Sequence, residues 1–245
     1  MAQLRLPREY RHAPELRYVR APEPLVFPEE EEVTEGSAHL IVRTFLYELL
    51  KFALGPEHSV GSDQFVYWIA SNPKRELSPD VFVCLGVPQT AFGSWKTWEQ
   101  GGVPELAVEI VSPNEGDGTT WEEKCARYYE VGVKELVRFD REELEGRRLR
   151  VWDRVKDDLV ERVIAADRTP CLTLGLAWAV RPIPAHPGEV VGLRVIDDDG
   201  RLLESRAEAE ARELRARVDT EAQARADAEA RVRELEEELR RRTPS

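Results

Sequence analysis

Three charged residues in the middle of the chain have the types and the spacing of a site for phosphoryl-transfer chemistry. Asp80 stands at the start of the apolar run VFVCL, and Glu109 interrupts the apolar run of PELAVEIVSP. Two carboxylates that converge from neighbouring strands form a hard oxygen site, which suits Mg²⁺ together with water and a substrate phosphate. The ion would polarise the phosphate and lower the pKa of an attacking water. Lys124, with Tyr128 on the same face of a predicted helix, could stabilise charge on the phosphoryl group.

Glu109 is the most unusual of these residues, because its strand is expected to be covered on both faces. The alternation of side chains along a strand puts Glu109 on the same face as Ala107 and Val111. An ionised carboxylate that is buried without a partner costs at least several kcal/mol. A cation, a hydrogen-bond donor or a raised pKa must therefore compensate for it.

Each residue also has a simpler interpretation. Asp80 follows Pro79 and could be an ordinary turn residue at the entry of a strand. Lys124 could be a solvated lysine on a helix, and Glu109 could form a structural ion pair with Lys124 or with an arginine. The spacing alone does not choose between a metal site and an ion pair.

The segments around these residues predict a mixed α/β fold. Residues 37–54 are apolar almost all round and precede Gly55-Pro56, which indicates a largely buried helix with a clear end. Three short segments rich in β-branched and aromatic residues then predict strands, the first two separated by the turn SNPKRELS. The three predicted strands are FVYWIAS, PDVFVCL and PELAVEIV.

A second helix and further strands follow. Thr120 and Glu123 have the spacing of a capping box, and Gly132 is a suitable helix terminator. ELVRFD predicts the next strand, and a hairpin is expected around Asp157-Asp158. The predicted core order is α-β-β-β-α-β, as a mixed sheet flanked by helices, with added β-hairpins and a long charged C-terminal helix.

The composition changes along the chain define four expected parts. Residues 1–23 are expected to be extended or disordered, and residues 24–181 to form the catalytic-type domain. Residues 182–201 are expected to be a linker with short strands. Residues 202–245 are expected to form a long helical tail.

The tail consists almost wholly of Ala, Glu, Arg and Leu, with apolar residues spaced alternately by three and four. Both heptad positions become polar in the middle, at Glu221 and Arg225. The pattern fits a coiled coil that joins copies of the chain, and it also fits a single solvated helix with Glu–Arg pairs one turn apart. One heptad position holds Ala211, Val218, Arg225, Val232 and Leu239, and the other holds Ala207, Leu214, Glu221, Ala228 and Leu235.

The composition narrows the classes of function. The 245 residues, 42% of them hydrophobic, can bury a sizeable core. No membrane-spanning stretch, signal peptide, nucleotide-binding glycine motif or zinc-type cysteine spacing is present, which favours a cytoplasmic protein without a nucleotide cofactor. The net charge of −12 means that binding to nucleic acid would need a local basic patch. The four scattered histidines are expected to be surface or capping residues.

The combination of SPDVFVCLGVP, SWKTWEQGGVPELAVEIVSPN and a helix with K-x-x-x-Y followed by GVKELVRFD resembles the Uma-two family of restriction-endonuclease-like proteins. That family belongs to the PD-(D/E)-x-K phosphodiesterase superfamily. The resemblance runs from about Pro24 to Val180, and the predicted core order agrees with that of the superfamily.

The resemblance implies that Asp80 and Glu109 bind the metal ion, Mg²⁺ or its substitute Mn²⁺. The superfamily commonly has its lysine at E-x-K, a position that is Val111 in this chain, and the family resembled keeps a lysine on the next helix, which matches Lys124. Ser112 and Tyr128 would be secondary members of the site.

Two hypotheses of function follow. The first is a Mg²⁺-dependent endonuclease that hydrolyses DNA phosphodiester bonds. The second is a catalytically inactive nuclease-fold protein that acts through its tail, in assembly or in binding a partner. The missing lysine at Val111, the net acidity and the tail motivate the second hypothesis.

Overall fold

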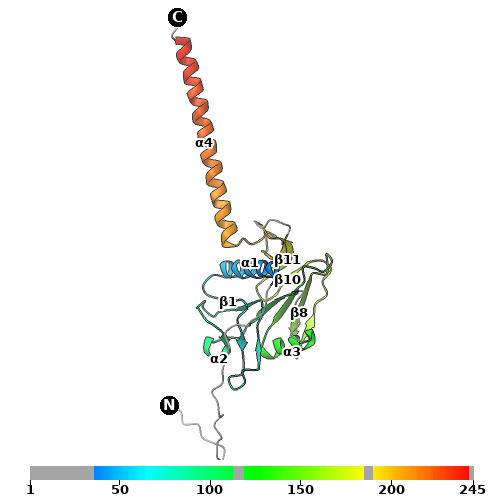
Figure 1. Cartoon of the computed structure of the whole chain (residues 1–245). Coiled ribbons are helices and arrows are strands. Elements are labelled where there is room, and N and C mark those ends of the chain that lie inside the picture. Colours follow the sequence, from blue (N-terminus) through cyan, green and yellow to red (C-terminus); the bar gives the residue numbers. More distant parts are fainter. Residues whose placement is uncertain (1–35, 113–118, 185–189, 243–245) are drawn as a thin grey trace, which may run out of the picture.

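The apolar segments build a six-stranded sheet with layers on both of its faces (Figure 1). The structure is a computed structural model and describes residues 36–112, 119–184 and 190–242. Its helices are α1 (Ser37–Leu54), α2 (Thr97–Gln100), α3 (Trp121–Val131) and α4 (Arg206–Arg242). Its strands are β1 (Ser59–Gly61), β2 (Val66–Tyr67), β3 (Glu76–Leu77), β4 (Val81–Cys84), β5 (Trp95–Lys96), β6 (Leu106–Ile110), β7 (Glu135–Phe139), β8 (Leu149–Val155), β9 (Asp158–Glu161), β10 (Arg168–Cys171), β11 (Leu176–Pro182) and β12 (Val191–Ile196).

The main sheet has the strand order β1-β4-β6-β7-β8-β9. Strand β6 pairs with β4 antiparallel and with β7 parallel, so the sheet is mixed, as predicted. All five residues of β6 are buried because the strand is central and covered on both faces.

Two apolar clusters lie on opposite faces of this sheet. On one face, α1 and the three-stranded sheet β10-β11-β12 pack against Leu106, Val108 and Ile110 of β6. On the other face, α3 and the small sheet β3-β2-β5 pack around Ala107 and Phe82. The alternation predicted for β6 is therefore confirmed, and Glu109 belongs to the face that α3 covers.

The identity of the first core strand differs from the prediction. FVYWIAS contributes only β2, which lies in the small sheet, and the expected turn SNPKRELS contains β3. The main sheet instead takes β1, whose sequence SVG is too short to give a strand signal. The core order α-β-β-β-α-β holds with β1 in the first strand position. The reason is that pairing with β4, and not local propensity, makes Ser59–Gly61 a strand.

Helix α1 has the predicted limits but is buried on one face only. Val42, Leu46, Leu49 and Leu50 are buried, whereas Phe52 is exposed in spite of its apolar character. The prediction of a largely buried helix was wrong in this respect, because only one side of α1 meets the sheet and the other side faces solvent.

Other local predictions are confirmed. Thr120 and Glu123 form the reciprocal capping box of α3, and Gly132 ends the helix with a φ of 114°. Strands β8 and β9 form the hairpin expected before and after Asp157.

Strand β12, between β11 and α4, is packed into the body. Residues 182–201 contain β12, which pairs with β11 and buries Leu193 and Val195 in the cluster beneath α1. Residues 1–23, expected to be extended, lie outside the described residues.

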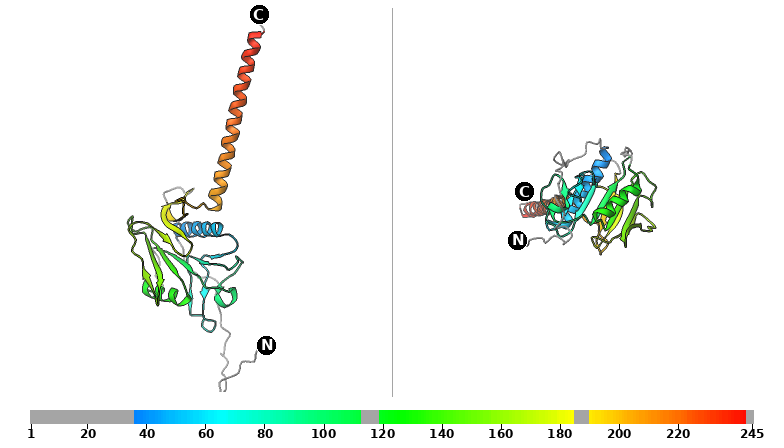
Figure 2. Two further views of the ribbon diagram at one scale, coloured as in Figure 1. Left: turned by 180° about the vertical axis from the view of Figure 1, so that it is seen from behind. Right: turned by 90° about the horizontal axis from the view of Figure 1, so that it is seen from below.

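Helix α4 extends away from the body as a single rod, which confirms the predicted long C-terminal helix (Figures 1 and 2). Its first turn is anchored because Arg194, itself buried, donates to Glu208 at 2.9 Å, and Glu208 also accepts from Ser205 N. No helix within residues 36–112, 119–184 and 190–242 is both long and apolar enough to cross a membrane.

Glu135 of β7 connects the main sheet to the sheet β10-β11-β12. Its carboxylate is fully buried and accepts hydrogen bonds from Thr173 N at 2.8 Å and from Trp178 Nε1 at 3.1 Å. Arg162 lies 3.7 Å from the same carboxylate.

Replacing Glu135 should destabilise the fold strongly. Glu135→Ala leaves an indole N–H and a peptide N–H buried without an acceptor and removes the carboxylate beside Arg162, so we expect the free energy of unfolding to fall by about 3 kcal/mol. Glu135→Gln keeps one acceptor oxygen, so its free energy of unfolding should fall by less than that of Glu135→Ala. Urea unfolding measures both, with Glu145→Ala in an exposed loop as a control within about 0.5 kcal/mol of wild type. A loss below about 1 kcal/mol in Glu135→Ala would contradict this role.

Candidate metal and phosphodiester site

The strand register brings Asp80 and Glu109 face to face. Val81 of β4 pairs with Val108 of β6, and this antiparallel register, continued by one residue, puts Asp80 opposite Glu109. Residues directly opposite each other in such a pair project to the same side of the sheet. Both carboxylates are buried, with 7% and 5% of the residue exposed. The predicted convergence of the two acids is therefore present in the structure.

Asp80 is held by the backbone of β6 and by α1. One carboxylate oxygen accepts a hydrogen bond from Ile110 N at 2.6 Å. The other lies 2.5 Å from Nε2 of His39, on the first turn of α1. The carbonyl oxygen of Asp80 accepts from the hydroxyl of Ser62, which Arg43 of α1 also contacts. These contacts fix both the backbone and the carboxylate of Asp80.

Glu109 is held from the opposite face by α3. The ammonium group of Lys124 donates to Oε2 at 3.0 Å, and the hydroxyl of the buried Tyr128 donates to Oε1. Lys124 and Tyr128 are one helical turn apart, so they reach the same carboxylate from one face of α3. The capping box at Thr120 determines where α3 begins and hence the position of Lys124.

Burial raises the pKa of Glu109 from 4.5 to about 7. The positive charge of Lys124 opposes this increase, whereas the negative charge of Asp80 adds to it, and the hydrogen bonds from Tyr128 and Lys124 also oppose it. Desolvation dominates because the carboxylate lies beneath α3 and against the central strand. The site therefore holds less negative charge at neutral pH than two ordinary carboxylates would.

The remaining predicted positions lie beside this group. Val111, at the usual E-x-K lysine position, follows the end of β6 and donates its N–H to Phe139 O at 2.8 Å. Ser112 is half-buried beyond it, and its side chain makes no hydrogen bond with any residue in the described part of the chain. Lys124, and not a residue of β6, supplies the cation next to Glu109.

His39 is a member of the site that the sequence interpretation missed. It was expected at the surface or at a helix cap, yet it is largely buried and in contact with Asp80. A signal was present, because His39 and Arg43 form a polar pair one turn apart in the mostly apolar first half of the helix. The pairing with a residue far along the chain could not be read from that pattern.

The donor chemistry fits a hard divalent cation with few protein ligands. Within the described ranges there is no cluster of three or more His, Cys, Asp or Glu side chains arranged around a metal position. Asp80 and Glu109 would thus provide two carboxylates, and a carboxylate oxygen that accepts one hydrogen bond retains a further lone pair. Mg²⁺ is commonly held by one or two carboxylates, with water and phosphate completing its octahedron.

Comparisons with known proteins identify similar sequences and structures. The family model Uma2, described as "Putative restriction endonuclease", matches residues 27–182. No curated protein matches the chain. A crystal structure described as "a putative nuclease belonging to DUF820", from Anabaena variabilis, is similar with a TM-score of 0.45 and 11% identity, over 58% of this chain and 76% of the other.

The raised pKa of Glu109 should make the stability of the metal-free protein depend on pH. Between the unfolded value of 4.5 and the folded value of about 7, the folded protein keeps a proton that the unfolded chain releases, so stability falls as the pH rises through this window. The free energy of unfolding of Glu109→Gln, relative to that of the wild type, should therefore rise by about 2 kcal/mol from pH 5 to pH 8.

Urea unfolding at the two pH values, with a chelator present, measures this difference. Glu145→Gln, in an exposed loop, is the control and should show no change with pH relative to wild type. If the difference in free energy of unfolding between Glu109→Gln and the wild type were also the same at both pH values, Glu109 would have an ordinary pKa.

Proposed function

The chain belongs to the Uma2 family, and from this premise we propose that it is a Mg²⁺-dependent endonuclease that hydrolyses DNA phosphodiester bonds. The observation that carries the proposal is the register of β4 and β6, which sets two buried carboxylates opposite each other beside one lysine. Mg²⁺ held by Asp80 and Glu109 would polarise the scissile phosphate and lower the pKa of the attacking water.

The protein side chains have separate roles in this proposal. His39 and the N–H of Ile110 hold the Asp80 carboxylate in a fixed orientation, as outer partners of metal ligands commonly do. Tyr128 restrains Glu109 in the same way. Lys124 is paired with Glu109, and its ammonium group would turn toward a phosphate oxygen as negative charge builds up there.

Cationic side chains near the site support a phosphate-containing substrate in spite of the net acidity of the chain. Arg138 of β7 is in register with Glu109 and lies 3.6 Å from Asp140. Arg43, one turn after His39 on α1, donates to Ser62 and lies 3.1 Å from Asp63. A second group of arginines, at positions 147, 148 and 150, lies before and in β8, and Arg150 is held there by Glu161 through two bonds of 2.8 Å. We propose phosphate binding at the carboxyl ends of β6 and β7, because Lys124 and Arg138 lie there beside Glu109.

A cleavage assay tests the proposed activity. The full chain with Mg²⁺ or Mn²⁺ should cleave linear, supercoiled or single-stranded DNA, and a chelator should stop the reaction. Asp80→Asn and Glu109→Gln should each lower the rate by roughly a hundredfold or more, and Lys124→Ala by about a hundredfold. Glu145→Gln, in the loop between β7 and β8, is the matched control and should retain the wild-type rate. Cleavage that persists in both Asp80→Asn and Glu109→Gln would contradict the assignment of these two residues as the metal-binding acids.

A second candidate function is supported by the contact between Lys124 and Glu109. This ion pair compensates the buried carboxylate without any metal, and Val111 occupies the usual lysine position. In that case the body is a catalytically inactive nuclease fold, and α4 provides the function through assembly or partner binding. Metal binding distinguishes the two candidates independently of activity.

Calorimetric titration with Mn²⁺ should detect one site in the full chain. Glu109→Gln and Asp80→Asn should abolish the heat signal, and His39→Ala should weaken the affinity by roughly ten- to a hundredfold through loss of the contact to Asp80. Glu145→Gln serves again as the control. An absence of binding in the wild-type protein would favour the inactive fold.

A further inference from the structure

Helix α4 carries apolar side chains that the body does not cover. From Ala211 to Arg242 every residue of the helix is exposed, including Leu214, Val218 and Leu239. The body touches α4 at its beginning, where Arg206 lies 5.8 Å from the ring centre of Phe52. Exposed side chains of this size on one rod require a partner or remain a liability to aggregation.

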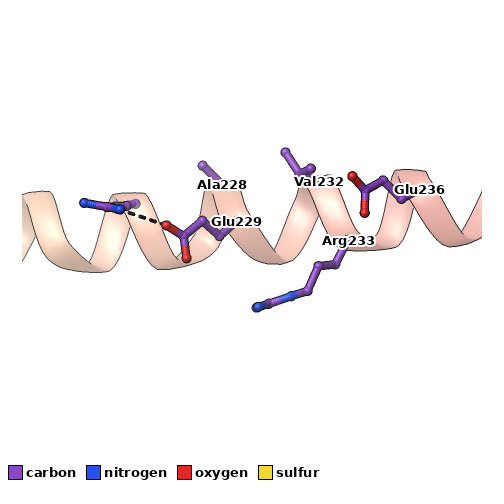
Figure 3. A pocket seen from close by; sticks show the side chains of 6 residues that line it. Ala228, Glu229, Val232, Arg233 and Glu236 are labelled. Carbon is purple, nitrogen blue, oxygen red and sulfur yellow. Dashed lines mark hydrogen bonds and ion pairs between the residues drawn. The ribbon is translucent and has the colours of Figure 1, made fainter.

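These residues form one line along the helix, which we call the tail stripe. Figure 3 shows Ala228 and Val232 on the same side of α4, with Arg233 pointing to the other side. The tail stripe has the spacing of a coiled-coil seam over its whole length. It consists of Ala207, Ala211, Leu214, Val218, Glu221, Arg225, Ala228, Val232, Leu235 and Leu239.

We propose that the tail stripe pairs with the tail stripe of a second copy of this chain, antiparallel, about a twofold axis at Gln223. In this register Glu221 of each copy meets Arg225 of the other. Four apolar layers flank these two ion pairs on each side of the axis. The layers are Val218 with Ala228, Leu214 with Val232, Ala211 with Leu235, and Ala207 with Leu239.

Charge complementarity is the first argument for this orientation. In a parallel pair the same register would set Glu221 against Glu221 and Arg225 against Arg225, with like charges in adjacent layers of the seam. The antiparallel register replaces both repulsions by two attractions. Charges within a seam are partly desolvated, so they weigh more than charges at the solvated rim.

The rim charges favour the parallel orientation. A parallel pair would set Glu210 against Arg215 and Arg231 against Glu236. The antiparallel pair would set Arg215 against Glu229, but also Arg217 against Arg231 and Glu210 against Glu238. In the structure Arg225 already reaches Glu229 of its own helix at 2.9 Å, an exposed contact that can be exchanged for Glu221 of the second copy at little cost. Exposed rim charges contribute little each, so the orientation is assigned from the seam, where the charges are partly desolvated.

Side-chain size is the second argument. Three of the four apolar layers combine one alanine with one larger residue, whereas a parallel pair would set Ala207, Ala211 and Ala228 each against itself. Layers of two alanines next to layers of two leucines cannot be filled at one constant helix separation. Layers of similar total volume pack uniformly along the rod.

The position of the axis is the third argument. Gln223 lies almost at the midpoint of α4, which runs from Arg206 to Arg242. The antiparallel pair would therefore use the full helix, about 55 Å, with neither end left over. The two bodies would lie at opposite ends and would not collide. This inference does not depend on whether the body is an active nuclease.

Sedimentation of the full chain between about 1 and 100 µM tests the pairing. The wild type should be a dimer. Glu221→Arg should raise the dimer Kd at least about tenfold, and the double exchange Glu221→Arg with Arg225→Glu should restore it. Glu213→Arg makes the same charge change on the outer face of α4 and should leave the Kd within about twofold. Circular dichroism verifies that each variant keeps its helix.

Cysteine cross-linking in a Cys125→Ser background tests the orientation. A mixture of Val218→Cys and Ala228→Cys chains should give a disulfide-linked heterodimer, because these positions face each other only in the antiparallel pair. In a parallel pair they would be about 15 Å apart along the axis, out of reach of a disulfide. Ala228→Cys alone should stay uncross-linked. A monomeric wild type at all concentrations, or cross-linking of Ala228→Cys with itself, would overturn the proposal.

Discussion

The body is organised around a carboxylate placed in the middle of a buried sheet. Glu109 lies on the central strand β6, where both faces are covered and the carboxylate loses most of its hydration. The β4–β6 register adds Asp80 directly opposite, which increases the electrostatic cost. The neighbouring elements compensate for it, α3 through Lys124 and Tyr128, and α1 through His39. The positions of both helices relative to the sheet are thus linked to one pair of acids.

A comparison of two buried glutamates shows why only one of them is a candidate for chemistry. Glu135, on the neighbouring strand and the opposite face, is satisfied by a peptide N–H and an indole N–H, which are fixed in the fold. Glu109 is satisfied by the ammonium group of Lys124, at the end of a long flexible side chain, and by the phenol of the buried Tyr128. Glu135 joins two sheets, whereas Glu109 lies near the carboxyl end of β6, opposite Asp80. Burial alone does not separate these roles, but the nature of the donors does.

The sequence revealed those features that depend on neighbouring residues. The capping box of α3, its end at Gly132 and the alternation around Glu109 are local, and each was predictable from a few positions. Two features were not predictable in this way. Ser59–Gly61 becomes a core strand only because β4 offers it an edge, and His39 joins the site only because α1 packs over the start of β4. Such long-range contacts are determined by packing of the whole chain, which no single segment encodes.

The length of α4 bears on how two bodies could share a substrate. A helix of 37 residues is about 55 Å long, which corresponds to about 16 base pairs of duplex DNA. If two chains pair through α4 and cut DNA as proposed, bodies at opposite ends of the rod could not reach the two strands at one point of scission. Each body would then act on its own stretch of DNA, and each event would produce a nick.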